Sequence, residues 1–238
     1  MLYNEEKEKE KTEIKDELNH GLFKEELKCT KYRLFIGGFN SIDHELDEII
    51  NELSKATPQD ELEIIISSPG GFTTDLMKME NTIRTYFYGR SKTILNSYGY
   101  SCGAMLFLCG DERIIYENSE LMFHNISTGT FGKLSDVKTE IKHNEKYFER
   151  YMKYSLKPYF SNSEMNDLLN GQEFWLDALE ICERGIATGI NVFGAIMDPK
   201  LYVEYRKNKK TKAELVKALK KNPNVLSLRD RDFLTSIK

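Results

Sequence analysis

Between about residues 31 and 190, the spacing of apolar positions changes repeatedly along the chain. Short apolar runs that stop at Gly, Pro or polar residues predict buried strands, and longer stretches with apolar residues three or four apart predict helices. Strands that alternate with helices favour a largely parallel sheet covered by helices, which is an α/β fold. The pattern predicts strands over 32–39, 61–68, 92–97, 112–117 and 120–125, and helices over 41–56 and 74–88.

The first of these helices has the features expected of an amphipathic helix that covers a sheet. Ser41 is a natural N-cap, and the acidic Asp43 and Glu45 suit the positive end of the helix dipole. Its apolar positions fall along one stripe, which predicts one buried face. They are Ile42, Leu46, Ile49, Ile50 and Leu53.

The two ends of the chain carry charge rather than apolar periodicity. Residues 1–30 alternate Glu and Lys, which predicts a charged N-terminal arm that is either a solvated helix or disordered. Residues 191–238 form a basic C-terminal extension, and its densest run, 205–221, is typical of a solvated helix face. We therefore expect one folded domain over 31–190 with an extension at each end.

Composition argues against several classes of protein. A net charge of −4 gives no overall basic field, so a nucleic-acid partner is not expected. No apolar run approaches the roughly 20 residues that span a bilayer, and the first residues are charged where a signal peptide is apolar. We expect a cytoplasmic protein with no membrane partner. The four cysteines lie too far apart in sequence for a zinc motif or a disulfide framework. They are Cys29, Cys102, Cys109 and Cys182.

Function is expected in the loops at the carboxyl ends of the parallel strands. A Pro-Gly-Gly turn that ends at Gly71 follows one strand, and its glycines can point backbone N–H groups at an anion. Ser101 and Cys102 open an apolar helix directly after another strand. His124 ends a third strand rather than lying on a polar surface.

Each of these features has a commoner structural explanation when it is taken alone. A Pro-Gly-Gly is usually a turn, a serine before a helix is usually an N-cap, and a histidine beside a strand is usually packed in the core. Together they supply what acyl transfer needs: a hydroxyl nucleophile, an imidazole to take its proton, and N–H donors for an oxyanion. The residues alone leave open whether Ser101 or Cys102 would be the nucleophile.

Four segments in order resemble the ClpP-type (caseinolytic) serine peptidases over about residues 31–190: YRLFIGG, EIIISSPGG, YGYSCGAMLFLCG and NSELMFHN. The resemblance implies a ClpP/crotonase-like fold, with repeated β-β-α and βα units, a largely parallel sheet and a projecting handle helix. It assigns the nucleophile to Ser101 and the general base to His124. The N–H groups of Gly71 and Cys102 would form the oxyanion hole, and no metal or other cofactor is implied.

The acidic member of the triad is where the chain departs from the family. The family has an aspartate a few residues before a Ser-Ala-x-Glu-Ala helix, and the matching stretch here is GQEFWLDALEICERGIATGI. Aligning that helix puts Glu173 at the aspartate position, and glutamate can also orient a histidine. Asp177 competes, but it falls at the helix start, where an N-cap is expected, and Asp167 is more remote. His143 lies in a polar helical stretch and is interpreted as a surface residue.

The resemblance also implies an assembly and partners. Residues 126–158 resemble the family's handle, a glycine-bearing extended segment and a long helix that interdigitates between two stacked rings. Gly70, Thr130 and Phe131 are expected to lie beside an extended polypeptide substrate, which pairs through its backbone. Family members usually receive unfolded chains from a ring-shaped ATPase unfoldase. The charged arm here is unlike their short apolar start, which suggests a divergent or viral member.

We therefore expect a serine endopeptidase that cleaves unfolded or extended polypeptides within a homo-oligomeric ring. Two alternatives stay open. One is a catalytically inert ring subunit or scaffold, which the substitution at Glu173 would allow. The other is a crotonase-like enzyme that binds acyl-coenzyme A, in which glycine turns also supply an oxyanion hole.

Overall fold

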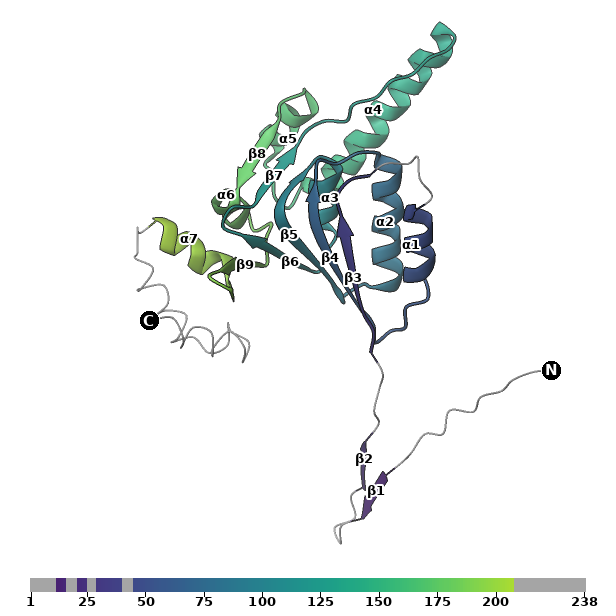
Figure 1. Ribbon diagram of the computed structural model, residues 1–238. Coiled ribbons are helices and arrows are strands. Elements are labelled where there is room, and N and C mark those ends of the chain that lie inside the picture. The colour runs from purple at the N-terminus through teal and green to yellow at the C-terminus, as the bar shows by residue number, and fades with distance from the viewer. Residues whose placement is uncertain (1–11, 16–20, 25–28, 40–44, 208–238) are drawn as a thin grey trace, which may run out of the picture.

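The computed structural model describes residues 12–15, 21–24, 29–39 and 45–207. Figure 1 shows a twisted sheet with helices α1 and α2 side by side and the long helix α4 projecting away from the body. The strands are β1 (Thr12–Lys15), β2 (Gly21–Lys24), β3 (Lys31–Ile36), β4 (Glu61–Ser68), β5 (Ser91–Tyr100), β6 (Glu112–Tyr116), β7 (Glu120–Phe123), β8 (Phe174–Asp177), β9 (Gly189–Val192) and β10 (Ala195–Met197). The helices are α1 (Glu45–Leu53), α2 (Thr73–Tyr86), α3 (Cys102–Leu108), α4 (Leu134–Leu156), α5 (Asn162–Leu169), α6 (Ala178–Glu183) and α7 (Pro199–Lys207).

The main sheet is largely parallel. Its strands follow the order β10-β9-β6-β5-β4-β3, and β7 and β8 extend it beside β5. The neighbouring pairs from β3 to β6, together with β5–β7 and β6–β9, are parallel, whereas β9–β10 and β7–β8 are antiparallel. The predicted α/β class with a largely parallel sheet is confirmed.

Strand β5 connects two parts of this sheet. Its first half, 92–95, pairs with β6, and its second half, 98–100, pairs with β7. The register between β4 and β5 shifts at Ile66/Ser68, where the change of partner occurs. The sequence predicts this strand only as far as residue 97, because pairing with the distant β7 holds the residues that continue it.

The core lies between the sheet and the helices that cover it. Ile64 and Ile66 of β4 have no solvent exposure, as expected for a central parallel strand. Helix α3 is buried from Cys102 to Phe107, and a helix that is apolar on every side belongs in the interior. Each large apolar side chain buried in this way contributes about 1.5–3 kcal/mol relative to its exposed state. The carboxyl end of β5 and the start of α3 are therefore held in a well-packed interior.

The predicted elements match the observed ones closely where local periodicity decides them. The strand predicted over 61–68 coincides with β4, and the helix predicted over 74–88 is α2, displaced by one or two residues. The helix predicted over 41–56 corresponds to α1, which begins at Glu45. The N-cap expected at Ser41 lies outside the described residues.

The N-terminal arm contains a two-stranded pair. Strands β1 and β2 are antiparallel, with Ile14 opposite Leu22 and Glu13 opposite Phe23. A helix is therefore the wrong interpretation for 12–15 and 21–24.

The described residues beyond 190 pack on the same sheet. The β9–β10 hairpin adds an antiparallel edge, and Met197 of β10 is buried. Tyr202 of α7 has no solvent exposure, so α7 covers this end of the molecule. The boundaries of the three-part division of the chain remain a prediction.

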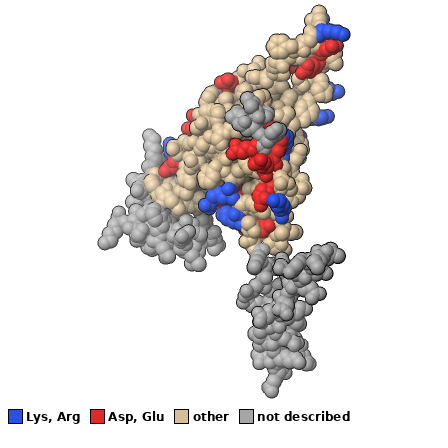
Figure 2. Space-filling model, turned by 45° about the vertical axis from the view of Figure 1, so that its right-hand side comes forward, with Lys and Arg blue, Asp and Glu red and all other residues tan. Residues whose placement is uncertain are grey.

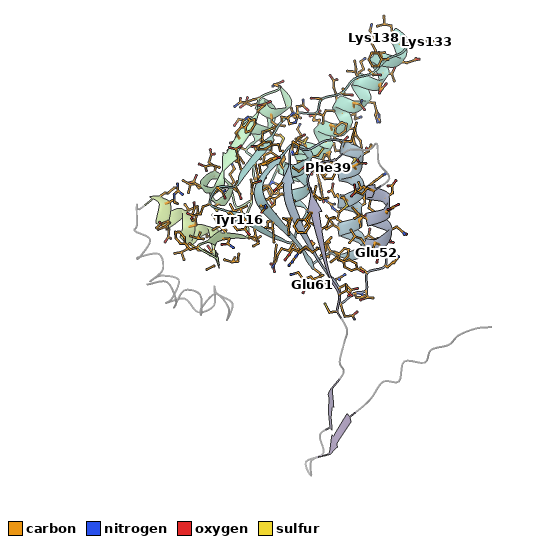
Figure 3. The ribbon with its side chains drawn as sticks, viewed as in Figure 1. Phe39, Glu52, Glu61, Tyr116, Lys133 and Lys138 are labelled. Atoms are coloured by element: carbon orange, nitrogen blue, oxygen red, sulfur yellow. The ribbon has the colours of Figure 1, made fainter. Side chains whose placement is uncertain are left out.

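The surface carries mixed charge. Figure 2 shows Asp and Glu side chains gathered in the middle of one face, with Lys and Arg side chains beneath them. Figure 3 shows Lys133 and Lys138 at the far tip of α4, well away from the sheet. Among the described residues, no helix combines the length and the apolar character needed to cross a membrane.

Candidate active site

Ser101 occupies the sharp turn between β5 and α3. Its backbone has φ 54° and ψ −120°, a conformation that residues with a side chain rarely adopt. The Ser101 N–H donates to the carbonyl of Met122 at 2.9 Å, and the Met105 N–H donates to the carbonyl of Ser101 at 3.1 Å. A strained strand-to-helix turn of this kind presents a nucleophilic hydroxyl in other hydrolases.

Glycines stand two residues before and two residues after Ser101, in the pattern Gly-x-Ser-x-Gly. A Cβ on Gly99 would lie 3.2 Å from the carbonyl oxygen of Gly103, and a Cβ on Gly103 would lie 2.8 Å from that of Ser68. The tight crossing of the turn over β4 therefore depends on both glycines. Sequence reasoning missed this pattern, although it is the one expected around a nucleophile on a tight turn.

The Pro-Gly-Gly turn lies directly against Ser101. A Cβ on Gly70 would come within 2.9 Å of the Cβ of Ser101 and 2.8 Å of the carbonyl oxygen of Tyr100. Gly70 also has a φ of 103°, which favours glycine on conformational grounds. The Pro-Gly-Gly turn can therefore approach the start of α3 this closely only because residue 70 has no side chain.

Gly71 faces the start of α3. Its bridge to Phe39 uses the carbonyl of Gly70 and the N–H of Phe72, so the bridge does not consume the N–H of Gly71. The Cys102 thiol donates to the Gly71 carbonyl at 3.2 Å. The N–H of Cys102 lies in the first turn of α3, where the helix has no carbonyl partner to offer. Both donors expected for an oxyanion hole are thus close to Ser101.

The neighbouring thiol is poorly suited to act as the nucleophile. Burial raises the pKa of the Cys102 thiol, so it stays protonated near neutral pH. A thiol reacts as its thiolate. The proton of Cys102 is instead used in the hydrogen bond to Gly71. These properties favour Ser101.

His124 follows β7 and shares a pocket with Ser101. The pocket has a volume of about 110 Å³ and is lined as well by both residues of the expected oxyanion hole. The β5–β7 pairing explains this arrangement, because Tyr100 lies opposite Met122 and the residues that follow are brought side by side. His124 is partly buried. Within the described part of the chain, no hydrogen bond joins the imidazole to the hydroxyl of Ser101.

The remaining walls of this pocket are mainly apolar and come from both the body and the handle. Tyr151 of α4 donates from its hydroxyl to Glu80 of α2 at 3.0 Å, and Arg84 forms an ion pair with the same carboxylate at 2.5 Å. Burial raises the pKa of Tyr151, so its phenol stays neutral. Sequence reasoning missed this wall, which includes Leu76, Met105, Phe123, Phe148 and Met152.

The structure does not bring Glu173 into the pocket with Ser101 and His124. The β7–β8 pairing ends with Phe123 opposite Phe174, one residue short of His124 and Glu173. Glu173 is exposed and does not line the pocket. In this structure the Glu173 carboxylate accepts a hydrogen bond from Nε1 of Trp175 at 3.0 Å, and no hydrogen bond to His124 is formed.

The competing acidic residues take other positions. Asp177 caps α6 and accepts from the Glu180 N–H at 2.9 Å, which confirms the predicted N-cap. It lies opposite Glu120, four residues from Glu173 and therefore about 13 Å along the strand. Asp167 belongs to α5, away from the pocket lining. His143 is exposed on α4, as predicted for a surface residue.

The residues expected along the substrate are only partly brought to the pocket. Thr130 donates from its hydroxyl to Glu140, and Phe131 is fully exposed to solvent. Neither lines the pocket, whereas Ile126 and Ser127 from the same segment do. The roles of Thr130 and Phe131 remain predictions.

Comparison with known families agrees with this geometry. The sequence model of the Clp protease family matches residues 31–192, about two thirds of the chain. The chain belongs to the Clp protease family. This family is typically a family of serine peptidases, and its fold accounts for the sheet and the projecting α4. The match ends where β9 ends, so the Clp protease region includes every residue named in the pocket.

In the stretches of chain that the structure describes, no group of three or more His, Cys, Asp or Glu side chains could hold a metal ion. The described groups near Ser101 are a hydroxyl, an imidazole and backbone N–H donors. Their arrangement suits acyl transfer by a serine hydroxyl.

Proposed function

We propose that the protein is a serine endopeptidase that cleaves peptide bonds of extended polypeptides. The observation that carries the proposal is the strained turn that presents Ser101 in one small, mainly apolar pocket with His124. Strain of this kind costs of order 1–3 kcal/mol and is retained where the surroundings over-determine it, commonly at active sites. Membership of the Clp protease family supports the same conclusion and implies polypeptide substrates.

The proposed reaction uses residues that line this pocket, together with Glu173 outside it. His124 takes the proton of the Ser101 hydroxyl as the oxygen attacks the substrate carbonyl carbon. The N–H groups of Gly71 and Cys102 stabilise the resulting oxyanion. His124 then gives the proton to the leaving amine. In the second half of the reaction, His124 takes a proton from a water molecule as the water attacks the acyl carbon, and it returns the proton to the Ser101 oxygen as the acyl group leaves. Glu173, which directly precedes the strand paired with β7, orients the imidazole.

Phosphonylation by a fluorophosphonate tests the nucleophile without a known substrate. Intact mass should show one adduct on the wild type and none on Ser101→Ala. His124→Ala should react very slowly, whereas the matched control His143→Ala, on the exposed side of α4, should react like the wild type. A wild type that is folded but does not react would remove the peptidase proposal.

A catalytically inert ring subunit is the second candidate, and one observation favours it. The Glu173 carboxylate accepts a hydrogen bond from Trp175 and none from His124. If the second carboxylate oxygen also formed no bond to His124 during encounter with the probe, the imidazole would lack its orienting partner. The same labelling experiment separates the two candidates, because an inert subunit would not react at Ser101.

A homo-oligomeric ring is proposed on the basis of α4 and the segment before it. Phe131, Leu134 and Ile141 are large apolar side chains with exposed fractions of 100%, 71% and 40%. They lie on the projecting part of the chain, where a second copy could cover them. Ile141→Asp should reduce the mass measured by light scattering, whereas Lys138→Asp at the charged tip should not.

A further inference from the structure

Aromatic side chains link the strand that carries Ser101 to the strand that follows Glu173. Tyr100 lies opposite Met122 in the β5–β7 pair, and Met122 lies opposite Trp175 in the β7–β8 pair. The rings of Tyr100 and Trp175 nevertheless meet edge to face, with centroids 5.1 Å apart. Two large rings thus meet across Met122, two residues before His124.

The Tyr100 ring is itself held in place. Its hydroxyl donates to Glu120 at 2.7 Å, and this hydrogen bond is the largest cause that raises the pKa of Tyr100 to about 12. The Tyr98 ring also packs against the Tyr100 ring, with ring centroids 4.8 Å apart. Trp175 therefore rests on an anchored surface, although 49% of it is exposed to solvent.

Trp175 lies in β8, and Glu173 directly precedes this strand, two residues away, so the two side chains share one face of the extended chain. The indole Nε1–H donates to Oε2 of Glu173 at 3.0 Å. A carboxylate accepts through both oxygens, so one bond to Oε2 leaves Oε1 available to a second donor. The tryptophan side chain has a single polar hydrogen, and in Trp175 this hydrogen is donated to Glu173, the candidate acid of the triad.

We propose that Trp175 is a positioning residue: its indole N–H holds one oxygen of Glu173 so that the other oxygen accepts from His124 when the site is engaged. The inference rests on the proposed function, because it presupposes that Glu173 orients His124. It also explains how glutamate serves at a position where the family has aspartate. The added methylene gives the carboxylate an extra rotatable bond, and the tether to Trp175 restricts it.

Trp175 is the only tryptophan in the chain, so its fluorescence reports this contact directly. In the full-length protein at neutral pH, Glu173→Ala should change the tryptophan emission, because the indole N–H loses its acceptor. Identical emission spectra of wild type and Glu173→Ala would overturn the proposed contact.

The catalytic consequence is measured as the rate constant of reaction with a fluorophosphonate. Trp175→Phe keeps an aromatic ring but removes the donor, and it should react about tenfold more slowly, as expected for losing a hydrogen bond to a charged group. Tyr98→Phe changes an aromatic residue in the same cluster without removing a donor to Glu173, and it should react at the wild-type rate. In a Glu173→Ala background, Trp175→Phe should cause no further decrease.

The outcomes separate this inference from the function on which it rests. An unreactive wild type, or a Glu173→Ala variant as reactive as the wild type, would overturn both the triad assignment and the role of Trp175. A slow Glu173→Ala with a fast Trp175→Phe would overturn the role of Trp175 alone. Equal losses from Trp175→Phe with and without Glu173 would indicate a merely structural role and would also overturn it.

Discussion

Replacing Ser101 by glycine should stabilise the fold while it abolishes reaction with the probe. The φ of 54° and ψ of −120° are held by surrounding hydrogen bonds and lie outside the regions that residues with a Cβ prefer. Such a conformation costs of order 1–3 kcal/mol. Glycine escapes this cost but gives the unfolded chain extra freedom, which is worth about 0.5–1 kcal/mol in the opposite direction.

The comparison that isolates the strain is Ser101→Gly against Ser101→Ala, because both lack the hydroxyl and only alanine keeps the Cβ. The relief of strain exceeds the cost of the extra chain freedom, so Ser101→Gly should be more stable to unfolding than Ser101→Ala by about 1 kcal/mol. For a chain of this size, that difference raises the melting temperature by about 2–4 °C. Calorimetry at matched protein concentration measures it, since any assembly would make the transition depend on concentration.

A control pair should show the opposite order. Thr139 is exposed in the interior of α4, where glycine is less favourable than alanine by about 1 kcal/mol. Thr139→Gly should therefore melt below Thr139→Ala. If Ser101→Gly also melted at or below Ser101→Ala, the turn would carry no strain, and the main structural argument for Ser101 as the nucleophile would be lost.

Two further predictions concern the glycine turn and an ion pair. Gly71→Ala should lower the melting temperature and abolish labelling of Ser101, because the new Cβ would lie 2.0 Å from the carbonyl oxygen of Phe39. Gly89 also has a positive φ, but the space around it is open, so the control Gly89→Ala should keep full labelling. The pKa of Glu164 is lowered to about 2, and the largest cause is its hydrogen bond to Arg184. The ion pair therefore stabilises the fold fully at pH values above the unfolded-state pKa of about 4.3. Glu164→Gln should therefore be less stable by about 1 kcal/mol at pH 7, and urea unfolding should show this difference disappearing as the pH falls from about 4.3 towards 2.

The parts of the fold that follow local periodicity could be predicted from the sequence. Strand β4 carries an apolar run that ends in Pro-Gly-Gly, and its bounds agree with the prediction. Strand β5 could not be delimited in this way, because 98–100 is held by β7 rather than by a local preference. The β1–β2 pair was missed because its charged residues obscure a short alternation that becomes a strand only with a partner.

The candidate site, like the fold, could be predicted from the sequence only in part. Ser101, His124 and Gly71 follow strand ends that the sequence marks clearly, and they line one pocket. The contribution of Tyr151 was not foreseeable, because the direction in which a projecting helix turns its faces depends on tertiary packing. The contact between Trp175 and Glu173 joins side chains two residues apart in an extended segment, and the sequence pattern does not identify 174–177 as a strand.

The hydrogen bond between Tyr151 and Glu80 joins the projecting helix α4 to helix α2 of the body. One wall of the pocket belongs to α2 and α3, and the opposite wall belongs to α4, so the width of the pocket depends on how these two parts are held. A force applied to the far tip of α4 would be transmitted along a helix of 23 residues to the wall beside Ser101. A displacement of α4 relative to α2 would therefore change the space beside the Ser101 hydroxyl.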